Sequence, residues 1–199
     1  MKITEITHKP QEISNDEQLL MHRIENECSD FVSVMKSHGF LYHGFKGIKK
    51  YDYNSPLQFA AASIKNRTPK DTPTWAQIKI DKMLRKAGFE AIRGNSLFCT
   101  ANVFTASYYG VPYFIFPVNG FKYTYCNMRD LYAAMPALYL KFENPKYNYE
   151  LFIKDYQFKN TELETALDNN REIYIHGKYI ALECEQWGNT VKAFWPTVP

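Results

Sequence analysis

Residues 111–118 read VPYFIFPV, the most nearly continuous apolar run in the chain. Because β-branched and aromatic residues favour strands, this run predicts a buried β-strand. The pair Asn119-Gly120 follows it, and residues 121–125 (FKYTY) form a second candidate strand. An Asn-Gly pair between two such runs is typical of the tight turn of a β-hairpin. The stretch therefore predicts two paired antiparallel strands.

The chain before this stretch contains both helix and strand signals. Apolar residues at helical spacing predict helices over residues 16–37, from residue 74 to a stop at Gly88, and over residues 102–109 with Asn102 as the cap. Short apolar runs predict strands over residues 40–45 (FLYHGF) and 89–92. Residues 47–55 and 66–73 are rich in polar and turn-forming residues, so we expect loops there.

The chain after this stretch is again mixed. We expect helices over residues 129–134 and 161–167, and strands over residues 172–175, 179–184 and 190–195. Residues 140–160 give no clear preference. No repeat or linker divides the sequence, which predicts one α+β domain over residues 16–199 after a flexible segment at residues 1–15.

Composition places the chain among ordinary globular proteins. Its 199 residues are enough for one large domain, with 45% hydrophobic and 23% charged residues. This excludes disorder, a collagen-like chain and a disulfide scaffold. The aromatic share, 16%, is high, and composition alone does not separate a ligand groove from ordinary core packing.

Charge and cysteine usage exclude several classes of site. A net charge of +3 is mild for a dedicated nucleic-acid binder. Basic residues gather in one stretch: Lys46, Lys49, Lys50, Lys65, Arg67 and Lys70. The four cysteines form no CxxC pair and have no zinc spacing with the histidines, so we expect no metal and reduced thiols. Neither a signal peptide nor a membrane span is visible, which predicts a soluble, intracellular protein without a membrane partner.

The first candidate site is His43 with Gly44 in the strand expected over residues 40–45. A histidine ring can donate a hydrogen bond to a ligand, and glycine lets a ligand approach the backbone closely. An ordinary, partly exposed strand end would contain the same pair. One residue does not separate the two interpretations.

The second candidate is the turn at residues 93–100 (RGNSLFCT), with Arg93, Ser96, Phe98 and Thr100. Hydroxyl and amide groups around a glycine offer hydrogen bonds and open space to a polar ligand. A β-turn with a helix cap explains the same residues.

The third candidate is Glu172, which opens a predicted strand. A carboxylate at such a position can stabilise a developing cation or act as a general base. A solvated charge at a strand edge is the alternative. Tyr108, Tyr109 and Tyr113 could stack on a ligand ring, although a helix and a core strand account for them equally well. Phosphate-binding and nucleophile-elbow motifs are absent from the sequence.

The order of the three candidates resembles that of the ADP-ribosyltransferase superfamily. Residues 41–44 (LYHG) look like its first motif in the histidine form. Residues 96–100 (SLFCT), followed by residues 106–109 (ASYY), look like the second, and residues 170–175 (NREIYI) look like the third. The resemblance implies a split, mostly antiparallel β-sheet flanked by helices, with NAD bound as the substrate.

The resemblance also implies a role for each matching residue. His43 would bind the adenosine ribose, and the backbone of Gly44 would contact the nicotinamide amide. Glu172 would hold the nicotinamide ribose and stabilise an oxocarbenium-like transition state. The expected catalytic residues are therefore His43 and Glu172, and the expected NAD-binding residues are Tyr42, Gly44, Arg93, Ser96, Phe98, Thr100 and Tyr109.

A second resemblance concerns the middle of the chain. Residues 67–73 (RTPKDTP), 93–100 and 109–117 (YGVPYFIFP) are similar to a family of small uncharacterised proteins of tailed bacteriophages. This similarity spans roughly residues 40–185. It implies a phage protein made in the host cytoplasm.

Two classes of function follow from these resemblances. The first is a transferase that passes ADP-ribose from NAD to a host protein or nucleic acid. The second is an inactive relative that binds or inhibits a host defence protein or nucleic acid. The second class is favoured by the missing family tyrosine, where Phe98 stands, and by the mildly basic loop at residues 46–70. Asn170 stands where the arginine class often has Glu or Gln, and His43 where that class has Arg, which also departs from an active site. A structural virion protein is a third class, without positive support.

Overall fold

The computed structural model describes residues 13–46, 57–60 and 72–196, with residues 57–60 described by their backbone alone. The segment at residues 1–12, the loop at 47–55 and residues 66–71 of the second expected loop lie outside the described residues. So do all members of the basic stretch except Lys46.

Two antiparallel sheets form the framework of the fold. The four-stranded sheet has the order β1-β4-β7-β2, with bounds Tyr42–Phe45, Val111–Pro117, Lys178–Glu183 and Leu57–Ala60. The three-stranded sheet has the order β3-β6-β5, with bounds Leu97–Cys99, Ile173–His176 and Lys122–Tyr125. Every pairing between these strands is antiparallel. The expected α+β class with antiparallel sheets is confirmed.

The two sheets meet where β1 approaches β3. The Tyr42 N–H donates to the Thr100 carbonyl at 2.8 Å, and the Thr100 N–H donates back to the Tyr42 carbonyl at 3.0 Å. β6 and β7 follow one another in the chain but belong to different sheets. Gly177 links them with φ +131°, a conformation that favours glycine. The first and second candidate segments therefore lie at the junction of the sheets.

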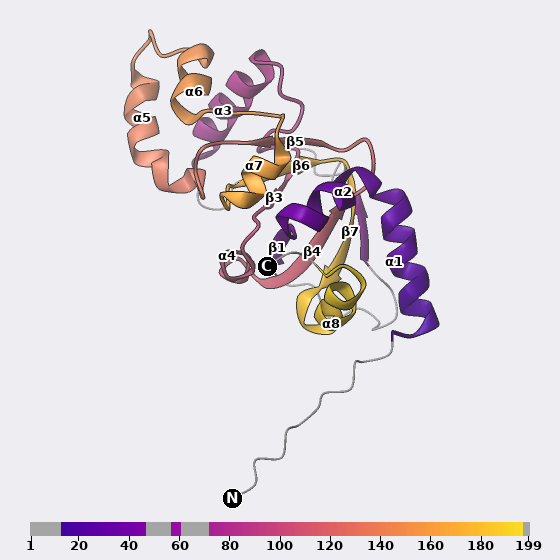
Figure 1. The fold of residues 1–199 in the computed structure, drawn as a ribbon. Helices are drawn as coiled ribbons and strands as arrows, with labels where there is room; N and C mark the ends of the chain where they lie inside the picture. Colours follow the sequence, from indigo (N-terminus) through magenta and orange to yellow (C-terminus); the bar gives the residue numbers. More distant parts are fainter. Residues whose placement is uncertain (1–12, 47–56, 61–71, 197–199) are drawn as a thin grey trace, which may run out of the picture.

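Helices lie in two groups around this framework (Figure 1). At the four-stranded sheet lie α1 (Asn15–Glu27), α2 (Ser29–His38) and α8 (Cys184–Phe194), and α7 (Leu163–Asp168) contacts α2. At the other end of the molecule lie α3 (Thr74–Lys86), α5 (Met135–Glu143) and α6 (Tyr149–Tyr156). The short α4 (Val103–Ser107) packs on β1 and β4, and the 3₁₀ helix η2 (Leu131–Ala134) leads into α5.

The helix predicted over residues 16–37 is two helices that meet at Cys28. Cys28 has φ −121° and ψ 24°, outside the helical region. The Asn119 side chain packs at this break, where it accepts a hydrogen bond from the Asp30 N–H at 3.0 Å and donates one to the Asn26 carbonyl at 3.2 Å. These bonds satisfy backbone groups that the interrupted helices leave unpaired.

The predicted hairpin at Asn119-Gly120 is wrong. The two residues do form a turn, in which the Phe121 N–H donates to the Val118 carbonyl at 3.1 Å. However, β4 lies between β1 and β7, so both of its edges are already paired, and β5 pairs with β6 in the other sheet. The turn redirects the chain from one sheet to the other.

Two further strand predictions are wrong. Residues 190–195 form the end of α8 and its cap, because Trp187, Val191, Phe194 and Trp195 repeat at helical spacing and pack on one core. Residues 89–92 form an irregular, bent segment after α3 and belong to no strand. The ambiguous residues 140–160 contain the end of α5 and all of α6, and β2 was not foreseen.

The buried residues form two hydrophobic clusters that share one strand. The first cluster lies between the four-stranded sheet and α1, α2 and α8. The second fills the space among α3, α5 and α6. Successive side chains of a strand point to opposite faces, so Ile173 and Ile175 of β6 enter the first cluster and Tyr174 enters the second.

Candidate functional site

A cleft of about 340 Å³ lies at the junction of the two sheets. Its walls come from β1, β3, α4, the start of α3 and the segment before η2. The expected catalytic and NAD-binding residues other than Ser96 line it: Tyr42, His43, Gly44, Arg93, Phe98, Thr100, Tyr109 and Glu172. Tyr108 and Tyr113, the other rings considered for stacking, do not line it. The fold therefore brings together residues that lie up to 130 positions apart in the sequence.

Ser96 lies outside the lining of the cleft. Its side chain is fully buried, and its hydroxyl donates to the Asn95 side-chain oxygen at 2.9 Å. Asn95 in turn accepts a hydrogen bond from the Ile92 N–H at 2.9 Å. The structure thus places Ser96 in the turn that carries Arg93, where it does not line the cleft.

His43 is held in place by the neighbouring sheet. Its Nδ1 is hydrogen-bonded to the carbonyl oxygen of Phe98. Its ring meets that of Phe45 edge-on, with the ring centres 4.4 Å apart. A carbonyl can only accept, so Nδ1 carries the proton. This bond fixes the orientation of the ring beside the cleft.

Gly44 allows a close approach between β1 and α4. A Cβ atom at this position would lie 2.0 Å from the carbonyl oxygen of Ala106 and 2.8 Å from the Gly110 nitrogen. The absence of a side chain is therefore required for packing within the chain, whatever its further value to a ligand.

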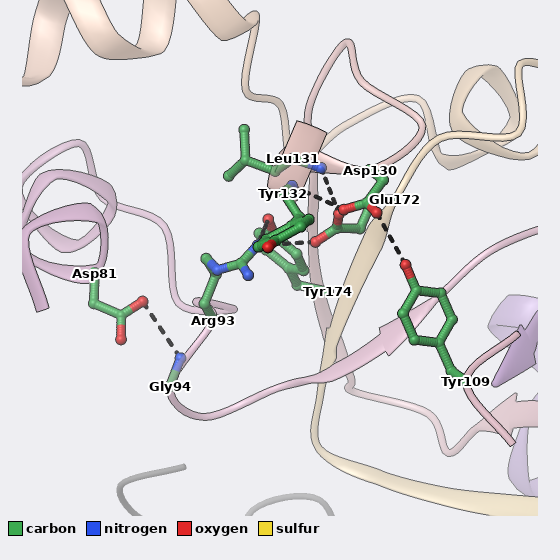
Figure 2. A network of polar contacts seen from close by, with 9 residues as sticks. All are labelled: Asp81, Arg93, Gly94, Tyr109, Asp130, Leu131, Tyr132, Glu172 and Tyr174. Carbon is green, nitrogen blue, oxygen red and sulfur yellow. Dashed lines mark hydrogen bonds and ion pairs between the residues drawn. The ribbon is translucent and has the colours of Figure 1, made fainter. Parts of the chain in front are cut away.

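Glu172 and Arg93 form a buried ion pair at the base of the cleft (Figure 2). Arg93 Nη1 donates to Glu172 Oε1 and to the Tyr174 hydroxyl, each at 3.0 Å. The second oxygen of Glu172 accepts the Leu131 N–H at 2.7 Å. Arg93 and Glu172 are only 5% and 8% exposed. Both carboxylate oxygens are therefore engaged within the protein.

Burial dominates the electrostatics of this network. Desolvation raises the pKa of Glu172 above its ordinary value, and the nearby Arg93 charge offsets part of that rise. Burial also acts against the charged form of Arg93, but Tyr174 and Glu172 keep the pKa of the guanidinium above its ordinary value. Burial and the Glu172 charge raise the pKa of Tyr174. At neutral pH Arg93 is charged and Tyr174 is neutral.

A second polar contact in the lining of the cleft joins Tyr109 to Asp130. The Tyr109 hydroxyl donates to Asp130 Oδ2 at 2.9 Å, and Asp130 Oδ1 accepts the Tyr132 N–H at 2.8 Å at the start of η2 (Figure 2). The segment from Asp130 to Tyr132 is thus held by Tyr109 from the α4 side. Glu172 holds the same segment through Leu131.

Asp81 of α3 supports the turn that carries Arg93. Its Oδ1 accepts the Gly94 N–H at 3.3 Å, and a Cβ at Gly94 would lie 2.5 Å from Oδ2 (Figure 2). Burial raises the pKa of Asp81, and the Gly94 hydrogen bond with the nearby arginines offsets part of that rise. A side chain at Gly94 would displace this carboxylate.

Several cleft residues were not found from the sequence. Tyr174 contacts the cleft residue Arg93 from outside the lining; it lies two positions after Glu172, and extended residues two apart share a face, so this signal was present. Asp130 precedes the helical segment expected at residues 129–134, a position typical of an N-cap. Lys46 belongs to the basic stretch noted in the sequence, and no local pattern marked these four: Thr72, Gln77, Arg129 and Tyr132.

The mouth of the cleft carries positive charge. Lys46 and Arg129 line it and are exposed. Neither takes part in an ion pair among the residues that the structure describes. Glu172 is paired with Arg93, and Asp130 adds a second carboxylate whose hydrogen-bond partners are neutral, so three cationic side chains and two carboxylates line the cleft.

No family model, curated protein or solved structure matches this chain. Within the described ranges, no cluster of three or more His, Cys, Asp or Glu side chains could hold a metal ion. In that same part of the chain, no helix is long and apolar enough to cross a membrane.

Proposed function

We propose that the cleft binds NAD or an ADP-ribosyl group, and that the protein transfers ADP-ribose to a host macromolecule, protein or nucleic acid, in the cytoplasm of a phage-infected bacterium. One observation carries the proposal. His43 on β1, Phe98 on β3 and Glu172 before β6 line the same cleft. These residues belong to the three motifs of the resemblance, which would place them around one NAD site.

The size and chemistry of the cleft support a nucleotide. Small-molecule sites usually have volumes of about 300–1,000 Å³, and this cleft, at about 340 Å³, is large enough for part of a dinucleotide. Tyr42, Phe98, Tyr109 and Tyr132 line it with rings that can stack on a base. Lys46 and Arg129 supply cations for phosphate oxygens.

The proposed transfer breaks the bond between nicotinamide and its ribose. The bonding electrons leave with nicotinamide, and positive charge develops on the ribose. Glu172 stabilises that charge, the acceptor forms the new bond to the ribose carbon, and the acceptor loses its proton. His43 binds the adenosine ribose and Thr100 supports the site.

Release of nicotinamide from NAD tests the transferase. The wild-type protein should release nicotinamide, and Glu172→Gln should reduce the rate by about 100-fold or more, because the carboxylate charge is lost where the cation develops. Glu90→Gln is the matched control, since Glu90 is exposed and lies outside the cleft. Equal rates for the wild-type protein and Glu172→Gln would contradict the assignment of Glu172.

The inactive relative is the second candidate, and one observation favours it. Both oxygens of Glu172 are occupied by Arg93 and Leu131, so the carboxylate must share existing bonds to reach a ribose. An inactive protein should bind ADP-ribose in calorimetry without releasing nicotinamide from NAD. Absence of both binding and release would remove the nucleotide proposal and leave a protein that binds a host defence protein or nucleic acid.

A further inference from the structure

The hydrogen bonds of Arg93 are unevenly distributed over its guanidinium. Nη1 donates both to Glu172 and to Tyr174. Nε is buried and has no acceptor among the described residues, and no hydrogen bond in this part of the chain uses Nη2. A buried donor without an acceptor costs free energy, and Nη2, which is not among the buried unpaired atoms, is the guanidinium nitrogen left for one more partner.

The aromatic rings around Arg93 fix the orientation of this group. The guanidinium carbon lies 4.7 Å from the centre of the Phe98 ring and 5.7 Å from that of Tyr174. Cation–π contacts of this kind restrict the arginine side chain, so less entropy is lost when a further hydrogen bond forms. Arg93 lines the cleft, which is therefore the place from which an acceptor can come.

We propose that Arg93 is an anion subsite in the cleft and binds a phosphate oxygen of the ligand. The inference rests on the proposed nucleotide function and specifies which part of the nucleotide Arg93 binds. A phosphate fits better than a carboxylate of a small acid because Lys46 and Arg129 line the same cleft and can share its higher charge, and with Asp130 included the cations still outnumber the carboxylates there. Glu172 is then an internal competitor, since it already occupies Nη1 of the same guanidinium.

This competition makes the expected effects of two variants opposite. Glu172→Gln removes the competing charge and leaves Arg93 in place, so binding of inorganic pyrophosphate should tighten several-fold. The paired variant Arg93→Gln/Glu172→Gln removes both buried charges together, which avoids an unpaired carboxylate. It should weaken pyrophosphate binding about ten- to hundredfold relative to Glu172→Gln, as expected for hydrogen bonds to a charged group.

Isothermal titration calorimetry with inorganic pyrophosphate, ADP-ribose and adenosine measures these effects. Circular dichroism confirms that each variant is folded. Lys36→Gln, which removes a cation outside the cleft, is the control and should bind all three ligands like the wild-type protein. Adenosine has no phosphate, so its affinity should be the same in the paired variant and in Glu172→Gln.

The outcomes separate the inference from the proposed function. If the paired variant binds ADP-ribose as tightly as Glu172→Gln does, the Arg93 subsite is refuted while nucleotide binding stands. If pyrophosphate binds in an Arg93-dependent way and ADP-ribose does not bind, the subsite stands and the nucleotide function fails. If the paired variant does not fold, pyrophosphate binding by Glu172→Gln that is unchanged or weaker than wild type refutes the inference.

Discussion

Gly44 has no room for a side chain. In Gly44→Ala the new Cβ would lie 2.0 Å from the Ala106 carbonyl, a backbone atom that can move only with the whole of α4. We expect a loss of about 1–3 kcal/mol in the free energy of unfolding, the range for overpacked sites. Urea unfolding monitored by circular dichroism measures this loss in the free energy of unfolding.

Gly188 provides the matched control for this substitution. It lies inside α8, and a Cβ there would meet nothing within 4 Å. Gly188→Ala should therefore raise the free energy of unfolding by about 0.5–1 kcal/mol, because alanine has the higher helix propensity. Equal effects of the two substitutions would show that the close approach of β1 to α4 does not constrain the fold.

Site residues were predictable one at a time but not as a network. His43 and Glu172 were selected because their residue types suit a ligand site, and both line the cleft. The contacts that hold these two residues in place were not foreseen. Phe98 holds His43 through a backbone carbonyl, which no side-chain pattern reveals, and Arg93 is 79 positions from Glu172.

At the scale of elements, Glu17 joins the first helix to the last. Its Oε2 accepts hydrogen bonds from the Ser14 backbone and hydroxyl, each at 2.8 Å, which forms a capping box at the start of α1. Its Oε1 accepts the Thr190 hydroxyl of α8 at 2.7 Å. The Ser14 backbone bond, followed by the Thr190 and Ser14 hydroxyls, lowers the pKa of Glu17 below its ordinary value.

Because the folded state favours ionised Glu17, its contribution to stability should depend on pH. At pH 7, Glu17→Gln should lower the free energy of unfolding by about 0.5 kcal/mol, because the neutral amide can still complete the capping box and only the carboxylate charge at the helix N-terminus is lost. The contribution is fully present above the ordinary pKa of 4.5 and is lost as pH falls through the lowered folded pKa. The difference between wild type and variant should therefore shrink below that pH in urea titrations.

An exposed glutamate elsewhere serves as the control for this prediction. Glu143 lies at the end of α5 and is exposed. At pH 7, Glu143→Gln should change the free energy of unfolding by less than about 0.5 kcal/mol. A difference between wild type and Glu17→Gln that stays constant down to pH 3 would contradict the proposed role of the ionised carboxylate.

At the scale of the whole molecule, the two hydrophobic clusters share β6. Trp75 contacts Tyr139 beside the second cluster, with ring centres 5.2 Å apart. Trp195 packs on Phe116 in the first cluster at 5.4 Å, and Trp187 lies at its edge. Since neighbouring side chains of β6 enter different clusters, neither cluster can lose this strand alone. We expect the two clusters to unfold together.

The three tryptophans can show whether the two clusters unfold together. In protein labelled with 5-fluorotryptophan, the three native ¹⁹F signals should disappear with one common urea midpoint, as for a two-state unit. A lower midpoint for the Trp75 signal alone would show that the helical end of the molecule unfolds independently.

The sequence alone determined most of the elements. The run at residues 111–118 forms β4, Asn102 caps α4 and Gly88 ends α3 as expected, because apolar periodicity, capping and glycine conformations act within a few residues. Prediction from the sequence failed where two local signals competed. Residues 190–195 (TVKAFW) resembled a strand when taken alone, but the helical spacing of the apolar residues from Trp187 onward places them in α8 and its cap.

Only the tertiary structure decided which strands pair and which side chains meet. The turn at Asn119-Gly120 separates two sheets because β7, more than sixty residues later, takes the edge of β4 that a hairpin would have used. The cleft likewise depends on the isolated bridge between Tyr42 and Thr100 and on the ion pair between Arg93 and Glu172. Spacing along the chain carries no record of such contacts, because they form only when distant segments are packed together.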